Sequence, residues 1–247
     1  MVIGDILNQE LVQKTVKDAS YVYHFAGIAG LADARKDPVT TVKNNVLGAT
    51  YILDACKTEQ VKRFLFASTI YVYSELGSFY RVSKQACEKI IEEYQKEFGL
   101  NYTILRFGSL YGPRANEFNA ICDYLTQALK NKKIVRRGDG EEIREYIHVK
   151  DAARLSVDVL DEEHRNKAIT VTGSQVLTSK ELIDLIFEIT GKKTHVTFKE
   201  MESAGYHYTM TPYRDTPQKA EKLIPKQFVD LGQGVLELVE ELYNEKL

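Results

Sequence analysis

The chain has 247 residues, of which 44% are hydrophobic and 28% are charged, and its formal net charge is −2. These values are those of a globular protein with one large domain, or with one domain and a smaller lobe. The balance of 33 basic and 35 acidic residues leaves no surplus for a broad basic face, which argues against a nucleic-acid partner.

Targeting and redox signals favour a cytoplasmic protein with no membrane partner. The first ten residues have neither a basic segment nor a long apolar run, so we expect no signal peptide. The longest nearly apolar stretch, residues 21–32, is too short to span a bilayer and contains His24. Cys56, Cys87 and Cys122 are widely spaced, and an odd count without a C-x-x-C motif suits a reduced compartment.

Strand-like and helix-like segments alternate along the first half of the chain. The run ASYVYHFAG is rich in Tyr, Val and Phe, which is typical of a buried strand. Pro38 stands near the start of a segment with helical spacing of its apolar residues. The predicted elements are strands at 19–27, 61–69 and 101–112, and helices at 37–58 and 80–99, the second ending at Gly99.

The second half continues the alternation with shorter elements. It predicts helices at 118–131, from about Asp151, at 179–191 and at 230–246, and strands at 132–138, 144–149 and 167–173. Strands alternating with helices predict right-handed crossovers and a parallel sheet, hence an α/β fold. Residues 1–112 and 143–173 are predicted to form the sheet domain, and 113–142 and 174–247 a smaller lobe.

Two tyrosines have a lysine four residues further on: Tyr80 with Lys84, and Tyr146 with Lys150. The spacing alone is a weak signal in a chain with 15 tyrosines, because such a pair on a helix is usually a solvated face. Tyr146 lies in a strand-like segment, where residues four apart are not brought together as they are on a helix. Only the first pair therefore merits a functional hypothesis.

The surroundings of Tyr80 strengthen that hypothesis. Ser68 and Thr69 end a predicted parallel strand, and the carboxyl ends of such strands border the crevice where these sheets bind ligands. A free tyrosine has a pKa of about 10, which a nearby lysine ammonium and a nicotinamide cation would lower. Tyr80, Lys84 and Thr69 thus suit a proton-transferring base, its charged helper and a hydroxyl for the substrate oxygen, in hydride transfer coupled to proton removal.

Seven segments, in order, resemble the extended short-chain dehydrogenase/reductases, specifically the NAD-dependent nucleotide-sugar epimerases and dehydratases. The resemblance covers most of residues 1–155 and implies a Rossmann-like, doubly wound parallel sheet with a C-terminal substrate lobe. It implies NAD as cofactor, with NADP as the alternative. The segments are VIGDI (2–6), YHFAG (23–27), DPVTTVKNNVLGATYILDAC (37–56), KRFLFASTIYVY (62–73), YRVSKQACE (80–88), ILRFGSLYGPR (104–114) and GDGEEIREYIHVKDAA (138–153).

The resemblance also implies a role for each matching residue. Tyr80 becomes the base, Lys84 lowers its pKa and holds the nicotinamide ribose, and Thr69 aids Tyr80. The implied cofactor contacts are Asp5, Ile6, Phe25, Ala26, Gly27, Asn45, Ser68, Tyr80 and Lys84. The implied contacts with a nucleotide-diphosphate sugar are Thr69, Ser109 and Arg144, the last because a planar guanidinium suits a diphosphate. No metal is implied.

Plainer readings exist for three of these residues. Arg144 is alternatively a surface arginine, and Asp5 a loop acid without a ligand. Asn45 is alternatively a helix residue that bonds only to the backbone.

Three departures from the family pattern bear on the site. No G-x-G-x-x-G or G-x-x-G-x-x-G turn for the cofactor pyrophosphate occurs in the sequence. VIGDI resembles the end of the family's third strand, so we expect the chain to be a fragment without roughly the first 50–60 residues of the usual fold. The short loop 74–79 implies an open site, and Ser109 stands where the family often has Asn.

The residues after Thr69 favour epimerisation over dehydration. The family's 4,6-dehydratases carry an Asp-Glu pair there, and this chain has Ile70 and Tyr71, which cannot supply the acid and base that loss of water needs. We therefore predict an NAD-dependent nucleotide-sugar epimerase acting at C4. The alternatives are a dehydrogenase or reductase of the same family, and a non-catalytic nucleotide-sugar-binding remnant. The resemblance further implies a homodimer through the helix after Asp37-Pro38 and the helix carrying Tyr80.

Overall fold

The computed structural model describes residues 1–116, 118–131, 133–191, 195–199, 209–212, 221–223, 225 and 227–245. They divide into two compact units, each described here by itself. Unit 1 falls within residues 1–107, 158–170 and 215–221, and unit 2 within 108–157, 171–214 and 222–247.

Unit 1 is built on a sheet with the strand order β1-β2-β3-β7-β10. Strand β1 (Tyr21–His24) pairs in parallel with β2 (Arg63–Thr69), and β2 in parallel with β3 (Tyr102–Phe107). The predicted α/β class with a parallel sheet is thereby confirmed. The other elements are α1 (Gln9–Val16), α2 (Leu31–Lys36), α3 (Pro38–Val42), η1 (Lys43–Leu47), α4 (Gly48–Thr58), η2 (Ile70–Tyr73), α5 (Ser78–Phe98), η3 (Glu162–His164), β7 (Lys167–Val171) and β10 (Glu221–Lys222).

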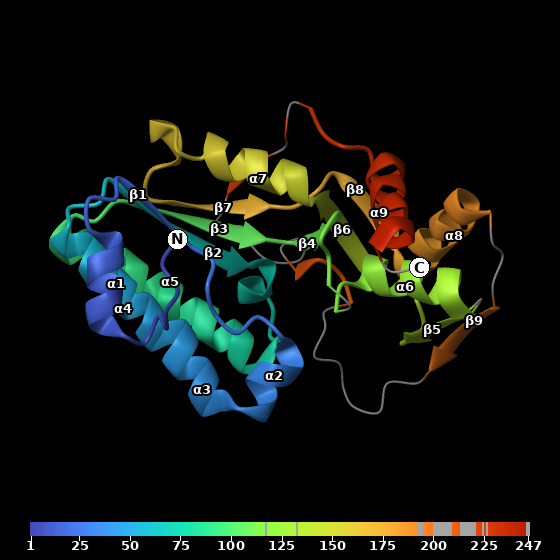
Figure 1. The fold of residues 1–247 in the computed structure, drawn as a ribbon, viewed down its shortest axis with the longest axis horizontal. Coiled ribbons are helices and arrows are strands. Elements are labelled where there is room, and N and C mark those ends of the chain that lie inside the picture. The colour runs from blue at the N-terminus through green and yellow to red at the C-terminus, as the bar shows by residue number, and fades with distance from the viewer. Residues whose placement is uncertain are drawn as a thin grey trace. The chain divides into compact units, whose positions relative to one another are not determined.

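Helices α1, α4 and α5 cover one face of this sheet (Figure 1). Alternate strand residues point to that face, so Phe64 and Phe66 of β2 pack with Ile104 of β3 in a single core. Leu53 of α4 and Ile91 of α5 close the core from the helical side, and all five side chains are buried. Burial of each such side chain contributes about 1.5–3 kcal/mol, which fixes α5 against β2.

The predicted helix over 37–58 is interrupted. Asp37 caps α3 by accepting a hydrogen bond from the backbone of Thr40 (3.0 Å), and a π-helical turn, η1, then separates α3 from α4. The apolar spacing continues through the turn and gave no sign of it. Such π-bulges are frequent at functional sites.

The predicted strand over 101–112 is two strands in different sheets. It breaks at Gly108, where a β-carbon would lie 2.6 Å from Cγ2 of Thr172. The Gly108 N–H instead donates to the carbonyl of Val171 (3.0 Å). The close approach that glycine allows ends β3, and β4 (Ser109–Tyr111) begins in unit 2.

Unit 2 contains a three-stranded sheet of order β4-β6-β8 and a two-stranded sheet, β5-β9. Helices α6, α8 and α9 pack around its core, which includes Leu125, Ile183 and Leu238. The elements are α6 (Ala120–Asn131), β5 (Lys133–Arg137), β6 (Ile143–His148), α7 (Val149–Asp158), β8 (Gln175–Thr178), α8 (Ser179–Thr190), β9 (His195–Lys199) and α9 (Leu231–Glu245).

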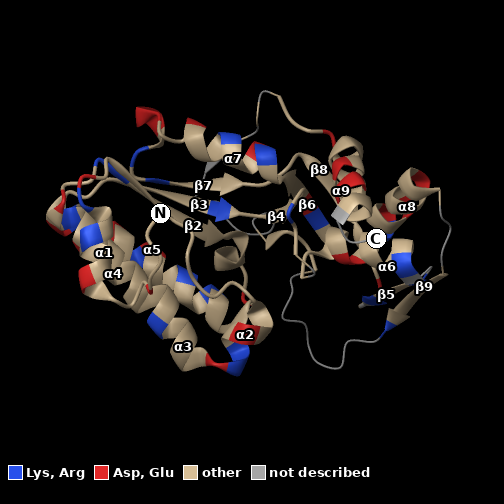
Figure 2. Cartoon of the chain, viewed as in Figure 1, with Lys and Arg blue, Asp and Glu red and all other residues tan. Residues whose placement is uncertain are grey.

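The unit boundaries differ from the predicted lobes. We predicted residues 143–173 with the large sheet, but β6 pairs in parallel with β4 and in antiparallel with β8, and residues 143–157 belong to unit 2. The assignment of one lobe to the cofactor and the other to the sugar stays a prediction. Basic and acidic residues are interspersed over the helices of both units (Figure 2).

Candidate functional site

Four of the polar residues predicted from the sequence lie where β2 ends and α5 begins. Ser68 and Thr69 are the last residues of β2, and both are buried. Gly77, with φ 106°, turns the chain into α5, which places Tyr80 in the first helical turn and Lys84 one turn later. The structure thus brings Thr69, Tyr80 and Lys84 to one end of the sheet, as the strand-then-helix order of the sequence suggested.

Lys84 is a buried cation tied to the strand. Its side chain is only 6% exposed, and Nζ donates a hydrogen bond to the carbonyl of Ala67 (2.7 Å). Nζ also lies 4.6 Å from the ring centroid of Phe66 and 6.0 Å from that of Tyr80. Burial lowers the pKa of Lys84 to about 8, and this fall is opposed by Cys87 and by the carboxylate of Glu88. The lysine is therefore still mostly charged at pH 7, and this buried ammonium lies beside the tyrosine ring.

Tyr80 is half-buried, and its phenol is hydrogen-bonded to the side chain of Thr69. Burial raises the pKa of Tyr80 above its ordinary value, and the hydrogen bond from Thr69 opposes that rise. Thr69 also caps the short helix η2, because its hydroxyl accepts from the backbone N–H of Tyr71 (3.3 Å). Tyr80 is therefore protonated at neutral pH in this state, and base chemistry requires further positive charge nearby.

Asn45, in the π-turn η1, joins the loop after β1 to the helix that carries Tyr80. Its side chain is buried, accepts from the N–H of Ile28 (2.7 Å) and donates to the carbonyl of Ile28 (2.9 Å) and to Oγ of Ser83 (2.9 Å). Ser83 in turn donates to the carbonyl of Tyr80 (2.8 Å). The plainer reading of Asn45, bonded only to backbone, is thus wrong, because the amide also holds a side chain of α5.

Phe25, Ala26 and Gly27 form an exposed loop at the end of β1. Gly27 has φ 144°, and a β-carbon there would lie 2.7 Å from Oδ1 of Asn45. Only glycine fits this backbone beside the amide. The ring of Phe25 stacks on Tyr23 with centroids 6.0 Å apart. The backbone at Ala26 and Gly27 is therefore exposed and carries only a methyl group and a hydrogen as side chains. We call this stretch the ledge.

Asp5 and Ile6 lie before α1. Asp5 is exposed, and its carboxylate accepts from the N–H of Leu7 (2.9 Å). Ile6 packs on the core of unit 1 over Gly48, where a β-carbon would meet its Cδ1 at 2.7 Å. The structure is thus compatible both with a ligand at Asp5 and with its reading as a loop acid.

Ser68 is hydrogen-bonded to a buried pair of charges. Its hydroxyl donates to Glu88 Oε1 (2.5 Å), and Glu88 is bound by Arg106 at 2.6 Å. Sequence reasoning missed Glu88 and Arg106, although Glu88 follows Lys84 by one helical turn. It also missed His24, a buried histidine at the end of β1 whose Nε2 has no hydrogen-bond partner among the described residues.

Ser109 and Arg144 belong to unit 2. Ser109 begins β4 and stands opposite Tyr146 of β6, and Arg144 is two residues away on β6 and on the same face of the strand as Tyr146. The half-buried guanidinium of Arg144 donates to the carbonyl of Ile143 (3.1 Å). The two predicted substrate residues therefore lie on paired strands.

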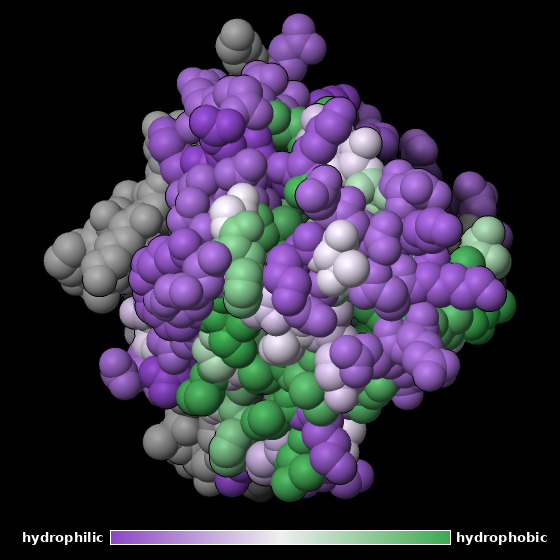
Figure 3. Space-filling model, turned by 90° about the vertical axis from the view of Figure 1, so that its left-hand side faces the viewer, coloured by the Kyte–Doolittle hydropathy of each residue, from purple (hydrophilic) through white to green (hydrophobic). Residues whose placement is uncertain are grey.

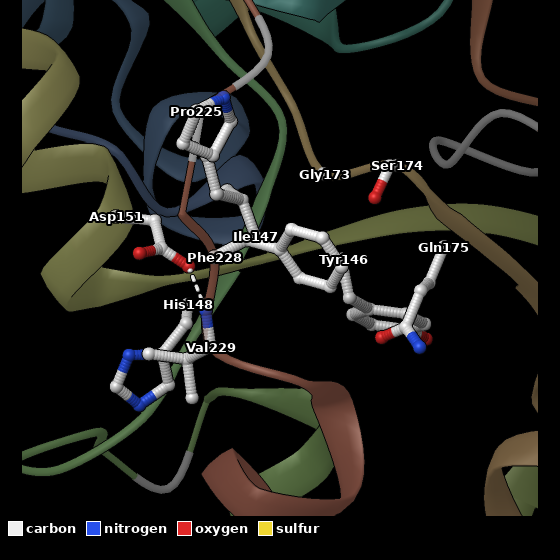
Figure 4. A pocket seen from close by; sticks show the side chains of 10 residues that line it. All are labelled: Tyr146, Ile147, His148, Asp151, Gly173, Ser174, Gln175, Pro225, Phe228 and Val229. Atoms are coloured by element: carbon white, nitrogen blue, oxygen red, sulfur yellow. Dashed lines mark hydrogen bonds between the residues drawn. The ribbon is translucent and has the colours of Figure 1, made fainter.

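A small pocket in unit 2 contains none of the predicted site residues (Figure 4). The buried carboxylate of Asp151 accepts there from the N–H of Val229 (2.8 Å) and from Nη1 of Arg154 (2.9 Å). It holds the segment before α9 in place, so we interpret this pocket as structural. The lining residues are Tyr146, Ile147, His148, Asp151, Gly173, Ser174, Gln175, Pro225, Phe228 and Val229.

The described residues show neither a cluster for a metal ion nor a helix for a membrane. Within the part of the chain that the structure describes, no group of three or more His, Cys, Asp or Glu side chains is placed to hold a metal ion. No helix in the described ranges is both long and apolar enough to cross a membrane.

Known proteins resemble the chain in sequence. A provisionally named UDP-glucose 4-epimerase of Methanocaldococcus jannaschii is 28% identical over 260 residues, which cover 98% of this chain and 83% of that protein. A dTDP-glucose 4,6-dehydratase of Streptomyces antibioticus is 26% identical and covers 96% of this chain and 74% of its own length.

Solved structures resemble its fold. The UDP-glucuronic acid 4-epimerase of Bacillus cereus, in complex with UDP-glucuronic acid and NAD, matches with a TM-score of 0.84 and 25% identity over 98% of this chain and 80% of that one. The UDP-glucose 4-epimerase of Thermotoga maritima with UDP-glucose matches with a TM-score of 0.83 and 23% identity, over 98% and 83%. The sequence profile of the NAD dependent epimerase/dehydratase family matches residues 1–172. With most of its length matched, the chain belongs to the NAD dependent epimerase/dehydratase family.

Proposed function

We propose that this protein is an NAD-dependent nucleotide-sugar epimerase that inverts C4 of the sugar. The observation that carries the proposal is the convergence of Thr69, Tyr80 and buried Lys84 at the carboxyl end of β2. Relatives and structural neighbours that are UDP-sugar 4-epimerases support it.

Tyr80 is the proton carrier in this proposal. Its phenol oxygen takes the proton of the sugar hydroxyl and later returns it, while the hydroxyl of Thr69 holds the sugar oxygen. The hydrogen bond from Thr69 opposes the rise that burial causes in the pKa of Tyr80. The positive charge of Lys84, 6.0 Å from the centroid of the Tyr80 ring, would further favour the phenolate. When bound, NAD supplies the hydride acceptor for the sugar carbon and a further positive charge.

The residues present fit part of a cofactor site. The exposed backbone of the ledge, at Ala26 and Gly27, allows close approach of a ligand, and a β-carbon at Gly27 would lie 2.7 Å from Oδ1 of Asn45. Nζ of Lys84 uses one of its three donors on Ala67, which leaves donors for a ribose hydroxyl. The residues that would hold NAD are Asp5, Ile6, Phe25, Ala26, Gly27, Asn45, Ser68, Tyr80 and Lys84. Because the hydroxyl proton of Ser68 is donated to Glu88, Ser68 could only accept a hydrogen bond from the cofactor.

The substrate in this proposal is a nucleotide-diphosphate sugar. The guanidinium of Arg144 would pair with the diphosphate, and Ser109 would donate to the sugar. Dehydration is disfavoured because Ile70 is buried and apolar and Tyr71 carries no carboxylate. The two residues after Thr69 therefore offer no acid and base pair for loss of water.

The experiment incubates the chain with NAD and UDP- or GDP-linked hexoses and follows the configuration at C4 by NMR. Inversion without net change in NADH is the expected result. Net NADH formation or consumption would instead indicate a dehydrogenase or reductase. Absence of NAD binding by calorimetry would favour a non-catalytic nucleotide-sugar-binding remnant.

We place the protein in the cytoplasm, in carbohydrate biosynthesis. The three cysteines are free and buried, which suits a reducing compartment. An oxidised form with disulfides recovered from cells would contradict this placement.

A homodimer is proposed through the helical side of unit 1. Hydrophobic side chains gather in the lower part of the face shown in Figure 3, the side on which these helices lie in Figure 1. The exposed apolar residues of these helical elements include Val42 of α3, Leu47 of η1 and Val82 of α5. Burying such a surface favours self-association. Sedimentation of Leu47→Lys should shift the chain to monomer, whereas Val157→Lys, exposed on α7, should leave the mass unchanged.

A further inference from the structure

A buried ion pair lies one helical turn beyond Lys84. Glu88 of α5 is 4% exposed and Arg106 of β3 is 8% exposed. The guanidinium binds both carboxylate oxygens, with Nε 3.1 Å from Oε1 and Nη2 2.6 Å from Oε2. Ser68 donates to Oε1 as well, at 2.5 Å. The carboxylate therefore joins the end of β2 to the helix of the candidate base.

The same guanidinium continues the network to the other side of Thr69. Nη1 of Arg106 donates to Oη of Tyr73 (2.9 Å), and that oxygen is 3.1 Å from Oγ1 of Thr170 in β7. The guanidinium carbon also lies 4.8 Å from the ring centroid of Tyr73. Ser68 precedes Thr69 and Tyr73 ends the short helix that Thr69 caps. The network thus holds the chain on both sides of the threonine.

Stability does not account for such a pair. Moving two charges out of water costs several kcal/mol for each ion, and well-packed apolar residues in their place are often as stable or more so. A buried carboxylate next to a lysine has a second effect, because it favours the charged form of the lysine. Glu88 acts on Lys84 in this direction, against the burial that removes the lysine from water.

We propose that Glu88 and Arg106 are positioning residues of the site: the pair aligns Thr69 with the Tyr80 turn, and its carboxylate keeps Lys84 charged. The function of the site that they serve rests on the proposed epimerase activity. The effect on the charge of Lys84 does not, because it is a property of the folded chain alone.

The test measures the titration of Lys84 directly. NMR of isotope-labelled lysine side chains, with the Lys84 signal assigned through Lys84→Arg, gives its midpoint in the wild type and in Glu88→Gln. Glutamine keeps the shape and can still accept from Ser68, but it removes the charge. We expect the Lys84 midpoint to fall by about 1 pH unit. The matched control is Glu92→Gln on the same helix, because Glu92 pairs with exposed Lys89 and not with the network. It should leave the midpoint unchanged.

Turnover supplies the second readout. In Glu88→Gln, kcat for C4 inversion should fall roughly 10-fold at pH 7 with its acid limb moved to higher pH, while KM for the sugar nucleotide stays the same. The double variant Glu88→Gln, Arg106→Met should regain stability without regaining the wild-type pH profile.

Two outcomes would overturn the proposal. One is an unmoved Lys84 midpoint in folded Glu88→Gln, and the other is full recovery of the pH profile in the double variant, which indicates packing alone. A shifted midpoint in a wild-type chain that shows no turnover would instead count against the epimerase function, and leave the charge coupling in place.

Discussion

The chain contains two Tyr-x-x-x-Lys sequences, and they differ in whether the tyrosine and the lysine lie on the same helix and in whether the lysine is buried. Tyr80 and Lys84 lie on one helix, with the buried ammonium 6.0 Å from the tyrosine ring centroid. Tyr146 is a buried residue of β6, and Lys150 lies on the following helix with its exposed Nζ bound to Glu237 (2.7 Å). Spacing in sequence therefore does not determine proximity, because only a helix turns residues four apart to the same face.

The difference extends to the neighbouring histidines. His24, near Lys84, is buried against Phe64 and Phe66, and its Nε2 has no partner among the described residues. His148, two residues after Tyr146, is equally buried, and its Nε2 likewise has no hydrogen-bond partner among the described residues, but the carboxylate of Glu237 lies 3.7 Å from it. One histidine thus lies near a buried ammonium, which disfavours its charged form, whereas the other lies near a carboxylate, which favours it.

Exchanging each tyrosine for phenylalanine gives the largest expected contrast. Tyr80→Phe removes the proton carrier and should lower kcat for C4 inversion by roughly 10²–10⁴-fold, with little change in KM. Tyr146→Phe should change kcat by less than about threefold, since Tyr146 has no part in the proposed proton transfer. Initial rates by NMR measure both.

Equal losses in the two variants would contradict the contrast, as would a Tyr80→Phe enzyme with wild-type turnover. Circular dichroism of each variant controls for misfolding. A folded but inactive Tyr146→Phe would place a catalytic role in unit 2 that its ion-paired surroundings do not suggest.

The residues that we propose for proton transfer could be found in the sequence because their signals are local. Tyr80 and Lys84 share one helix, and Thr69 ends the strand before it. The predicted end of that helix at Gly99 is confirmed, with φ 73° in the left-handed region. Local patterns of this kind do not depend on how distant segments pair.

Other features depend on long-range contacts and escaped prediction. Arg106 meets Glu88 and Tyr73 across 18 and 33 residues, and only the register of β2 with β3 brings them together. The π-turn at 43–47 interrupts a helix whose apolar spacing is continuous. Likewise, the strand break at Gly108 follows from the close approach of Thr172, which no local pattern encodes.

The histidines provide a smaller contrast, in stability against pH. Burial and the charge of Lys84 lower the pKa of His24 to about 4, so between pH 6.5 and 4 the unfolded chain binds a proton that the folded chain does not. The stability that His24 contributes is therefore complete above pH 6.5 and is lost as the pH falls through 4. The full loss is about 3 kcal/mol. Urea unfolding at pH 7 and pH 4.5 should show His24→Gln losing less stability in acid than the wild type.

His148→Gln is the matched variant. Burial also lowers the pKa of His148, but the carboxylates of Glu237 and Asp151 oppose that shift. His148→Gln should therefore reduce the loss of stability between pH 7 and pH 4.5 by less than His24→Gln does. If His148→Gln reduces the loss of stability in acid more than His24→Gln does, the prediction that His24 has the more strongly lowered pKa is wrong.

The lysines give the smallest effects, and their signs should differ. Burial lowers the pKa of Lys84 from 10.5 to about 8, so at pH 7 the charge of Lys84 destabilises the folded state by about 3 kcal/mol. The hydrogen bond to the carbonyl of Ala67 and the contact with the Phe66 ring offset only part of this cost. Lys84→Met should accordingly raise the free energy of unfolding by about 1 kcal/mol while abolishing turnover. Lys150→Met should lower it by about 0.5 kcal/mol and preserve turnover, because it removes an exposed pair with Glu237. Urea midpoints at pH 7 measure both. If Lys84→Met instead lowers the free energy of unfolding, the ammonium of Lys84 stabilises the fold, as that of Lys150 does. The Tyr80–Lys84 and Tyr146–Lys150 pairs would then differ only in how exposed their lysines are.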